Sequence, residues 1–190
     1  MPLVRAMFEG IVNASYIQSH PEKAEDFKRY GLLFIQKSYR QIENLSGRTV
    51  DAKAKQSIED SLDPYRGADG KVAAPKNDWT DLNLVDRAKD VNLGKLVALA
   101  YYRAIEIAHP SMLHVLSQLK KEDGQTLVFG NSQKNSEEKV REALAISHFL
   151  AIEVLILLHK TFGDDDLKAY IVDCSRDYNV TWKPITDASS

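Results

Sequence analysis

The longest apolar stretch of the chain, ALAISHFLAIEVLILLH at residues 143–159, places the strongest constraint on the fold. It is shorter than the roughly 20 mostly apolar residues that a membrane-spanning helix needs, and it is interrupted by His148 and Glu153. A soluble chain must cover such a stretch with other elements. We therefore expect a buried core helix surrounded by further helices, and no membrane association.

Helical periodicity begins at the N-terminus. Residues 3–19 carry apolar side chains in an i, i+3, i+4 rhythm, which predicts an amphipathic helix with a wide buried face. A second helix is expected from Pro21, a residue suited to a first helical position, to Gly47, a typical helix terminator. Its expected buried side consists of Ala24, Phe27, Leu32, Ile35, Tyr39, Ile42 and Leu45.

The middle of the chain alternates short helices with polar connections. Residues 50–63 predict a short, largely exposed helix, and residues 64–78 a long loop rich in proline and glycine. Trp79 precedes a short helix, and Asn92 is suited to cap the helix that follows it. The sequence TLVF at residues 126–129 predicts a short strand.

Two helices are expected after residue 132. Asn135 and Glu138 resemble a capping box, which starts the long apolar helix and carries it to about Phe162. A last helix opens at residues 164–166 and ends near Tyr178. The predicted fold class is therefore all-α, a bundle of about six to seven helices with a long loop around residues 64–78. A chain of 190 residues can bury one core, so we expect a single domain over residues 1–178 and a C-terminal tail over residues 179–190.

Composition indicates an ordinary soluble protein of the cytoplasm. Apolar residues make up 44% of the chain and charged residues 27%, and the net charge of -2 gives no general attraction to nucleic acid or anionic membranes. The only cysteine, Cys174, suits a reducing compartment, and the first helix lacks the features of a secretory signal. No motif for a cofactor or metal is present, and His148 and Glu153 lie five residues apart, a spacing that does not place two ligands on one helix face.

A helix expected over residues 96–109 carries three titratable groups, Arg103, Glu106 and His109, before Pro110. One interpretation is structural: an ion pair, and a histidine that donates to the carbonyls left free at the helix end. The other is a site formed by two copies of the helix, because Arg103 and His109 lie on different faces and would converge only across a twofold axis. Arg141 and His148 form a second pair of this kind.

The first helix carries a polar stripe of Arg5, Glu9 and Asn13 in otherwise apolar surroundings. A guanidinium and a carboxylate in such a helix are expected to be desolvated and paired. Glu9 has two candidate partners, Arg5 one turn away and Arg103 of the other helix. The second pairing would orient Arg103 toward an incoming anion.

Three segments resemble an uncharacterised family of all-helical bacterial proteins. They are VRAMFEGIVNASYIQSHPEKAEDFKRY, DWTDLNLVDRAKDVNL and LVALAYYRAIEIAHPS, and the resemblance covers roughly residues 3–115 and continues loosely into the long helix. Members usually carry further helices before the helix with the Arg and Glu, whereas this chain starts at it. That difference favours dimerisation.

The segment RAIEIAH also resembles the HEPN superfamily, whose ribonuclease members carry an Arg, four to six residues, and a His. This resemblance implies a metal-independent ribonuclease that acts as a homodimer and needs no cofactor. His109 would serve as general acid or base, Arg103 would stabilise the charge on phosphorus, and Glu9 with Arg5 would hold Arg103 in place. Many HEPN-like proteins are catalytically inert.

Two functions therefore stay open. The favoured one is a helical binding or scaffold module of a bacterial system, such as defence against phage, whose partners are a second copy and another protein. The alternative is the HEPN-like ribonuclease, for which RNA is the substrate.

Overall fold

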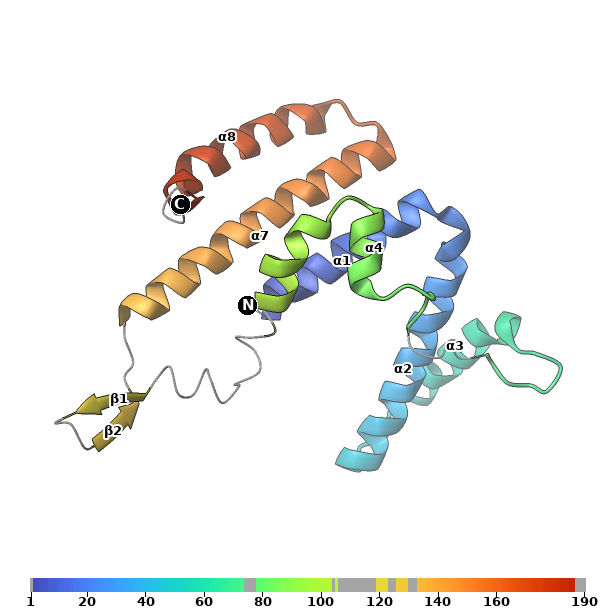
Figure 1. The fold of residues 1–190 in the computed structure, drawn as a ribbon. Helices are drawn as coiled ribbons and strands as arrows, with labels where there is room; N and C mark the ends of the chain where they lie inside the picture. The colour runs from blue at the N-terminus through green and yellow to red at the C-terminus, as the bar shows by residue number, and fades with distance from the viewer. Residues whose placement is uncertain are drawn as a thin grey trace. The chain divides into compact units, whose positions relative to one another are not determined.

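The computed structural model describes residues 2–73, 78–103, 105, 119–122, 126–129 and 133–186 (Figure 1). The protein is all-α as predicted, with one short β-hairpin. Its contacts divide the chain into two compact units, one formed by Met1–Gln18 with Arg87–Ser190 and the other by Ser19–Asp86. Residues 1–178, which we expected to form one domain, fall in both units.

Helix α1 (Pro2–Ser19) forms the N-terminal part of the first unit and matches the predicted helix. Its buried side chains repeat at intervals of three and four residues, so they form one face of the helix. These side chains are Val4, Phe8, Ile11, Val12 and Tyr16.

The chain returns to the first unit within α4 (Leu84–Asp90), because the boundary between the two units lies between Asp86 and Arg87. Asn92 follows α4 with a φ of 63°, and its backbone N–H donates to Lys89 O. Asn92 therefore ends α4 in a left-handed conformation that asparagine tolerates, and the prediction that it caps the next helix is wrong. That next segment consists of a 3-10 turn, η3 (Gly94–Leu96), followed by a π-helix, η4 (Val97–Tyr102).

A short β-hairpin precedes the last two helices. Strands β1 (Leu119–Glu122) and β2 (Thr126–Phe129) pair antiparallel, with Leu119 opposite Phe129 and Glu122 opposite Thr126. The predicted strand at residues 126–129 is confirmed.

Helices α7 (Gln133–Phe162) and α8 (Asp166–Thr186) lie side by side as an antiparallel pair (Figure 1). Gly163 ends α7 with a φ of 68°, a conformation that favours glycine. The predicted capping box is wrong because α7 begins two residues before Asn135. The predicted tail is wrong over residues 179–186, since α8 continues to Thr186, and Trp182 Nε1 donates to His148 Nδ1 on α7 at 3.1 Å.

Only part of α7 behaves as the expected core helix. Ala145, Ile146, Leu150 and Ile152 are buried, but just 22% of the most apolar window of the helix is buried. Within the described residues, the segment Glu137–Phe162 is also long and apolar enough to cross a membrane by length and composition, with a mean hydropathy of 1.7. The apolar stretch of 17 residues at 143–159 is too short to span a membrane by itself, but α7 continues on both sides of it.

The second unit begins with a 3-10 turn, η1 (Pro21–Lys23), which continues into α2 (Ala24–Ser46). Gly47 ends α2 as predicted, with a φ of 66° and its N–H on Glu43 O. Helix α3 (Ala52–Leu62) follows, capped by Asp51, and ends in a 3-10 turn, η2 (Asp63–Tyr65). As predicted, α3 is largely exposed.

The prediction of a buried side on α2 is wrong, because no residue of α2 is buried. The buried residues of the second unit come instead from its other elements: Leu62 at the end of α3, and Trp79, whose ring meets Phe27 edge to face at 5.0 Å.

Candidate functional site

The predicted pair on α1 is present. Arg5 Nε donates to Glu9 Oε1 at 2.7 Å, one helical turn away. The two side chains are 35% and 37% exposed, so the expectation of full desolvation is wrong. The hydrogen bond that Arg5 donates to Glu9 raises the pKa of Arg5; partial burial opposes this effect, and the charge of Glu9 adds to it. Asn13 continues the stripe, and its Oδ1 is buried without a hydrogen-bond partner within the described part of the chain.

The Arg5 guanidinium also lies over the ring of Tyr101, 5.0 Å from its centroid. This cation–π contact joins α1 to the π-helix η4. The same guanidinium forms the ion pair with Glu9. Arg5 is therefore held between Glu9 and Tyr101.

Arg103 follows η4 directly, and its Nε lies 3.5 Å from Glu142 Oε1 on α7. The side chains of Arg103 and Glu142 are 39% and 29% exposed, which makes this a partly solvated ion pair. Glu9 pairs with Arg5, and Glu142 contacts Arg103, so the proposed Glu9–Arg103 pairing is not what the structure has. The other two groups of this stretch, Glu106 and His109, lie outside the described residues, as does His114.

The π-helix before Arg103 is a feature that sequence reasoning missed. The wider turn of a π-helix changes the direction in which the following side chains project, and such turns occur often at functional sites. The run VALAYY has no proline or glycine that would signal it. Val97 and Ala100 of η4 are buried.

The second arginine and histidine pair has a structural environment. His148 accepts a hydrogen bond from Trp182 and lies edge to face with Tyr178 at 5.5 Å, whereas Arg141 is exposed. Acceptance at Nδ1 fixes the tautomer that carries its proton on Nε2. His148 therefore anchors α8 to α7.

The charged groups of α7 do not form a metal site. Glu153 lies on α7 and burial raises its pKa, with Lys160 opposing the shift. No group of three or more candidate metal ligands occurs within the described residues.

A cavity of about 190 Å³ between α2 and α3 is the second feature that the sequence did not predict. Two contacts lie in its wall: an ion pair between Lys55 and Glu43, and a hydrogen bond that Glu59 accepts from Gln36 at 2.6 Å. A cavity this small and polar is below the usual size of a cofactor site. Its wall consists of Gln36, Tyr39, Arg40, Glu43, Lys55, Ile58 and Glu59.

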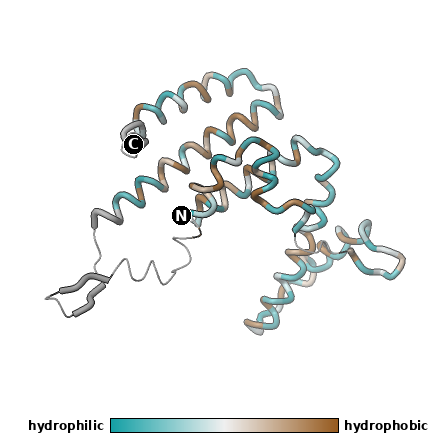
Figure 2. The backbone as a smooth tube through the Cα atoms, in the orientation of Figure 1, coloured by the Kyte–Doolittle hydropathy of each residue, from teal (hydrophilic) through white to brown (hydrophobic). Residues whose placement is uncertain are grey.

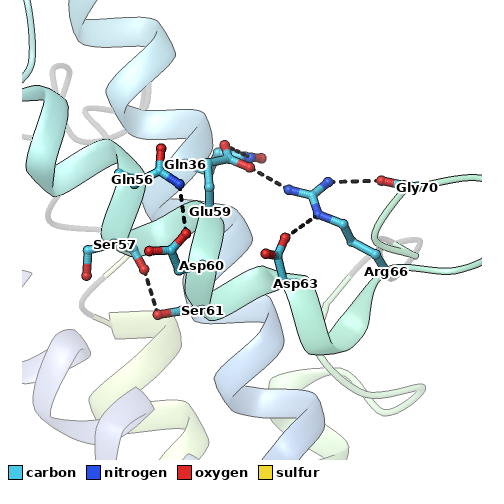
Figure 3. A network of polar contacts seen from close by, with 9 residues as sticks. All are labelled: Gln36, Gln56, Ser57, Glu59, Asp60, Ser61, Asp63, Arg66 and Gly70. Atoms are coloured by element: carbon cyan, nitrogen blue, oxygen red, sulfur yellow. Dashed lines mark hydrogen bonds and ion pairs between the residues drawn. The ribbon is translucent and has the colours of Figure 1, made fainter.

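A polar network joins this wall to the loop after α3 (Figure 3). Arg66 donates to Glu59 at 2.6 Å, to Asp63 at 2.9 Å and to the carbonyl of Gly70 at 2.9 Å. Hydrogen bonds to Asp63 and then Glu59 raise the pKa of Arg66. The network holds the first part of the predicted long loop against α3, and an isolated bridge from Arg66 to Val72 closes it.

Residues 1–126, which are 126 of the 190 residues, match a described family of unknown function. The chain belongs to DUF5677. No curated protein and no solved structure matches the chain.

The DUF5677 segment contains most of the candidate site. Arg5, Glu9, Tyr101 and Arg103 lie within it, as does the cavity between α2 and α3. Helices α7 and α8 lie beyond it, so Glu142 and the anchoring pair of His148 and Trp182 are contributed from outside the matched segment. The resemblance to an uncharacterised all-helical family is thereby confirmed.

Proposed function

We propose that this DUF5677 protein is a helical binding module that docks an amphipathic helix of a partner protein on α2. One observation supports the proposal: the faces of α2 are oriented opposite to the usual arrangement, in which the apolar face packs and the polar face is exposed. Its polar face carries the hydrogen bond and ion pair with α3, and most of its apolar face is exposed, although Phe27 meets the ring of Trp79.

The polar face of α2 carries its contacts with α3. Gln36 donates to Glu59, and Glu43 pairs with Lys55 and also accepts from the backbone N–H of Val50 at 3.0 Å. The contacts with Lys55 and Val50 lower the pKa of Glu43. At 100° per residue, Gln36 and Glu43 project from the same side of the helix.

The opposite face of α2 is apolar and exposed. Phe27, Phe34 and Leu45 lie within about 20° of one another around the axis, and the two isoleucines extend the stripe to one side. Phe34 is 62% exposed and Leu45 87%. The α2 stripe consists of Phe27, Phe34, Ile35, Ile42 and Leu45.

Covering this stripe would be strongly favourable. Full burial of an exposed Phe or Leu side chain contributes about 1.5–3 kcal/mol. Phe34 and Leu45 have the most surface left to bury. An exposed apolar stripe with polar residues on the other side of the helix is a surface on which the apolar face of a second helix can dock. A scaffold role in a bacterial defence system is consistent with such a surface.

A photo-crosslinking experiment tests the proposal. A benzophenone side chain placed at Phe34 of the full chain, in the native cells, should yield one adduct with another protein at a defined mass. The same group at Arg40, an exposed residue on the polar face, should not. A crosslink within the same chain, or no adduct at Phe34, would contradict the proposal.

A second function, the HEPN-like homodimeric ribonuclease, is favoured by the π-helix η4, which directly precedes Arg103. In this function His109 moves the proton and Arg103 stabilises the charge on phosphorus. Glu142, rather than Glu9 and Arg5, would hold Arg103, since Glu142 lies beside it.

The test is cleavage of single-stranded RNA in the presence of a chelator. His109→Ala and Arg103→Ala should each lower the rate by two to four orders of magnitude, and Glu142→Gln by less, while Glu9→Gln leaves it unchanged. Wild-type protein that leaves the RNA intact would exclude the ribonuclease.

A further inference from the structure

A second exposed apolar stripe lies on α7, in the other compact unit. Its members follow the heptad-like intervals of four and seven residues, so they lie within about 40° of one another around the helix axis. Figure 2 shows hydrophobic positions recurring along α7. The α7 stripe consists of Val140, Leu144, Ala151, Leu158 and Phe162, all of them exposed.

Within the part of the chain that the structure describes, the contacts of α7 leave this stripe uncovered. Helix α8 packs on another side, where Tyr178 meets His148 and Phe149. Ile146 and Leu150 are buried on a third side. The α7 stripe lies between these covered sides, and Leu144 is 55% and Phe162 74% exposed.

The stripe is symmetric about its central residue. Leu144 and Leu158 each lie seven residues from Ala151, and Val140 and Phe162 each lie eleven residues from it. The smallest side chain is therefore at the centre, with a leucine and then a larger apolar residue at equal distances on both sides. A helix with this pattern is complementary to an antiparallel copy of itself, which is the requirement for a twofold interface.

We propose that α7 is the homodimer interface of this protein, and that two copies pack antiparallel with Ala151 at the twofold axis. Leu144 of one copy then packs on Leu158 of the other, and Val140 packs on Phe162. The small side chains at the axis allow the two helix backbones to approach closely. Antiparallel packing also places the positive end of each helix dipole beside the negative end of its partner.

A second copy fits this surface better than a lipid bilayer does. A spanning helix is apolar on all sides, whereas the apolar stripe of α7 is narrow and its other sides carry Glu153, His148 and the contacts with α8. The stripe extends about 33 Å along the axis at 1.5 Å per residue. A single helix pair of this length covers less than the roughly 800 Å² per partner of a standard interface. We therefore expect a reversible monomer–dimer equilibrium.

The orientation is tested by disulfide crosslinking in a Cys174→Ser background, which removes the only native thiol. A mixture of Leu144→Cys and Leu158→Cys chains should form the mixed disulfide in high yield on mild oxidation. Leu144→Cys alone should crosslink poorly, since residues 144 of the two copies lie far apart in an antiparallel pair. Efficient crosslinking of Leu144→Cys alone would show a parallel pair and overturn the proposal.

The location of the interface is tested by sedimentation velocity across a concentration series. Wild type should shift toward the dimer with rising concentration, and Leu144→Glu should remain monomeric to at least tenfold higher concentration. Phe34→Glu on α2 is the matched control and should dimerise like wild type, which separates this proposal from the docking surface on α2.

Two results would overturn the interface on α7. One is loss of the dimer in Phe34→Glu with retention in Leu144→Glu. The other is wild-type protein that stays monomeric throughout the series; binding of that monomer to vesicles of mixed neutral and anionic lipid would then assign the α7 stripe to a membrane surface.

Discussion

At the scale of single residues, the ion pairs and hydrogen bonds of Glu9 and Glu59 differ in how many segments of the chain they connect. The pair of Arg5 and Glu9 lies within one helix and is about one-third exposed. Glu59 instead joins three elements of structure, since it accepts from Gln36 on α2 and from Arg66 in the loop after α3. We therefore expect Glu59 to contribute more to stability than Glu9.

The first prediction concerns these two glutamates. Because exposed i, i+4 pairs contribute only about 0.3–0.5 kcal/mol, Glu9→Gln should change the melting temperature little. Glu59→Gln should lower it more, since it weakens contacts that join α2, α3 and the loop. Thermal denaturation of both variants by circular dichroism measures the difference, and a larger loss in Glu9→Gln would show that the Arg5 pair is buried in solution.

The second prediction concerns Glu153. Burial raises its pKa above the ordinary value of 4.5, so the folded state binds the proton more tightly than the unfolded state does. The folded state therefore has its full stability below pH 4.5, where Glu153 is protonated in both states. It loses stability as the pH rises through the folded-state pKa, because the buried carboxyl group must then ionise. Glu153→Gln should raise the melting temperature at pH 7 and leave it unchanged at pH 4.

The control for Glu153 is Glu138→Gln, an exposed position on the same helix. It should give no gain at pH 7. An equal gain in both variants would assign the effect to the overall charge of α7 rather than to burial.

At the scale of elements, amphipathic pattern and burial are separable in this protein. The buried face of α1 follows its apolar pattern, whereas α2 has an equally clear apolar stripe that stays exposed. The difference arises because the contacts of α2 with α3 are made by its polar side chains.

The third prediction compares two phenylalanines. Phe8 on α1 is fully buried, so Phe8→Ala should cost about 3–5 kcal/mol in the free energy of unfolding. Phe34→Ala on α2 should cost less than about 0.5 kcal/mol, as surface substitutions do. Urea denaturation of both variants measures these costs. A cost for Phe34→Ala near that of Phe8→Ala would mean that the chain itself covers the α2 stripe.

At the scale of the whole molecule, the chain extends beyond its DUF5677 segment by the pair α7 and α8. This pair supplies Glu142 to Arg103, the anchoring contact between Trp182 and His148, and the stripe proposed for dimerisation. The part of the chain outside the matched segment therefore completes contacts made inside it.

The fourth prediction tests the end of α8. Truncation after Tyr178 removes Trp182 and with it the hydrogen bond to His148, so the melting temperature should fall. Truncation after Thr186 is the matched control and should leave it unchanged. Trp182→Phe, which keeps an aromatic ring but loses the donor, should fall between the two. Equal stability of the two truncated chains would show that α8 ends near Tyr178 in solution.

The sequence by itself determined the features that depend on local chemistry. The helical class, the bounds of α1, the end of α2 at Gly47 and the strand at residues 126–129 follow from periodicity and turn residues. The i, i+4 spacing also made Arg5 one of the two candidate partners of Glu9. Each involves neighbours within a few residues along the chain, whose geometry the backbone fixes.

The tertiary structure alone decided which faces and which distant residues meet. Nothing in the local pattern of α2 shows that Gln36 and Glu43, rather than the apolar stripe, would contact α3. The extension of α8 to Thr186 depends on a tryptophan that reaches a histidine 34 residues earlier in the chain. The partner of Arg103 and the π-turn before it also depend on packing, because an arginine bonds whichever carboxylate the fold brings within reach.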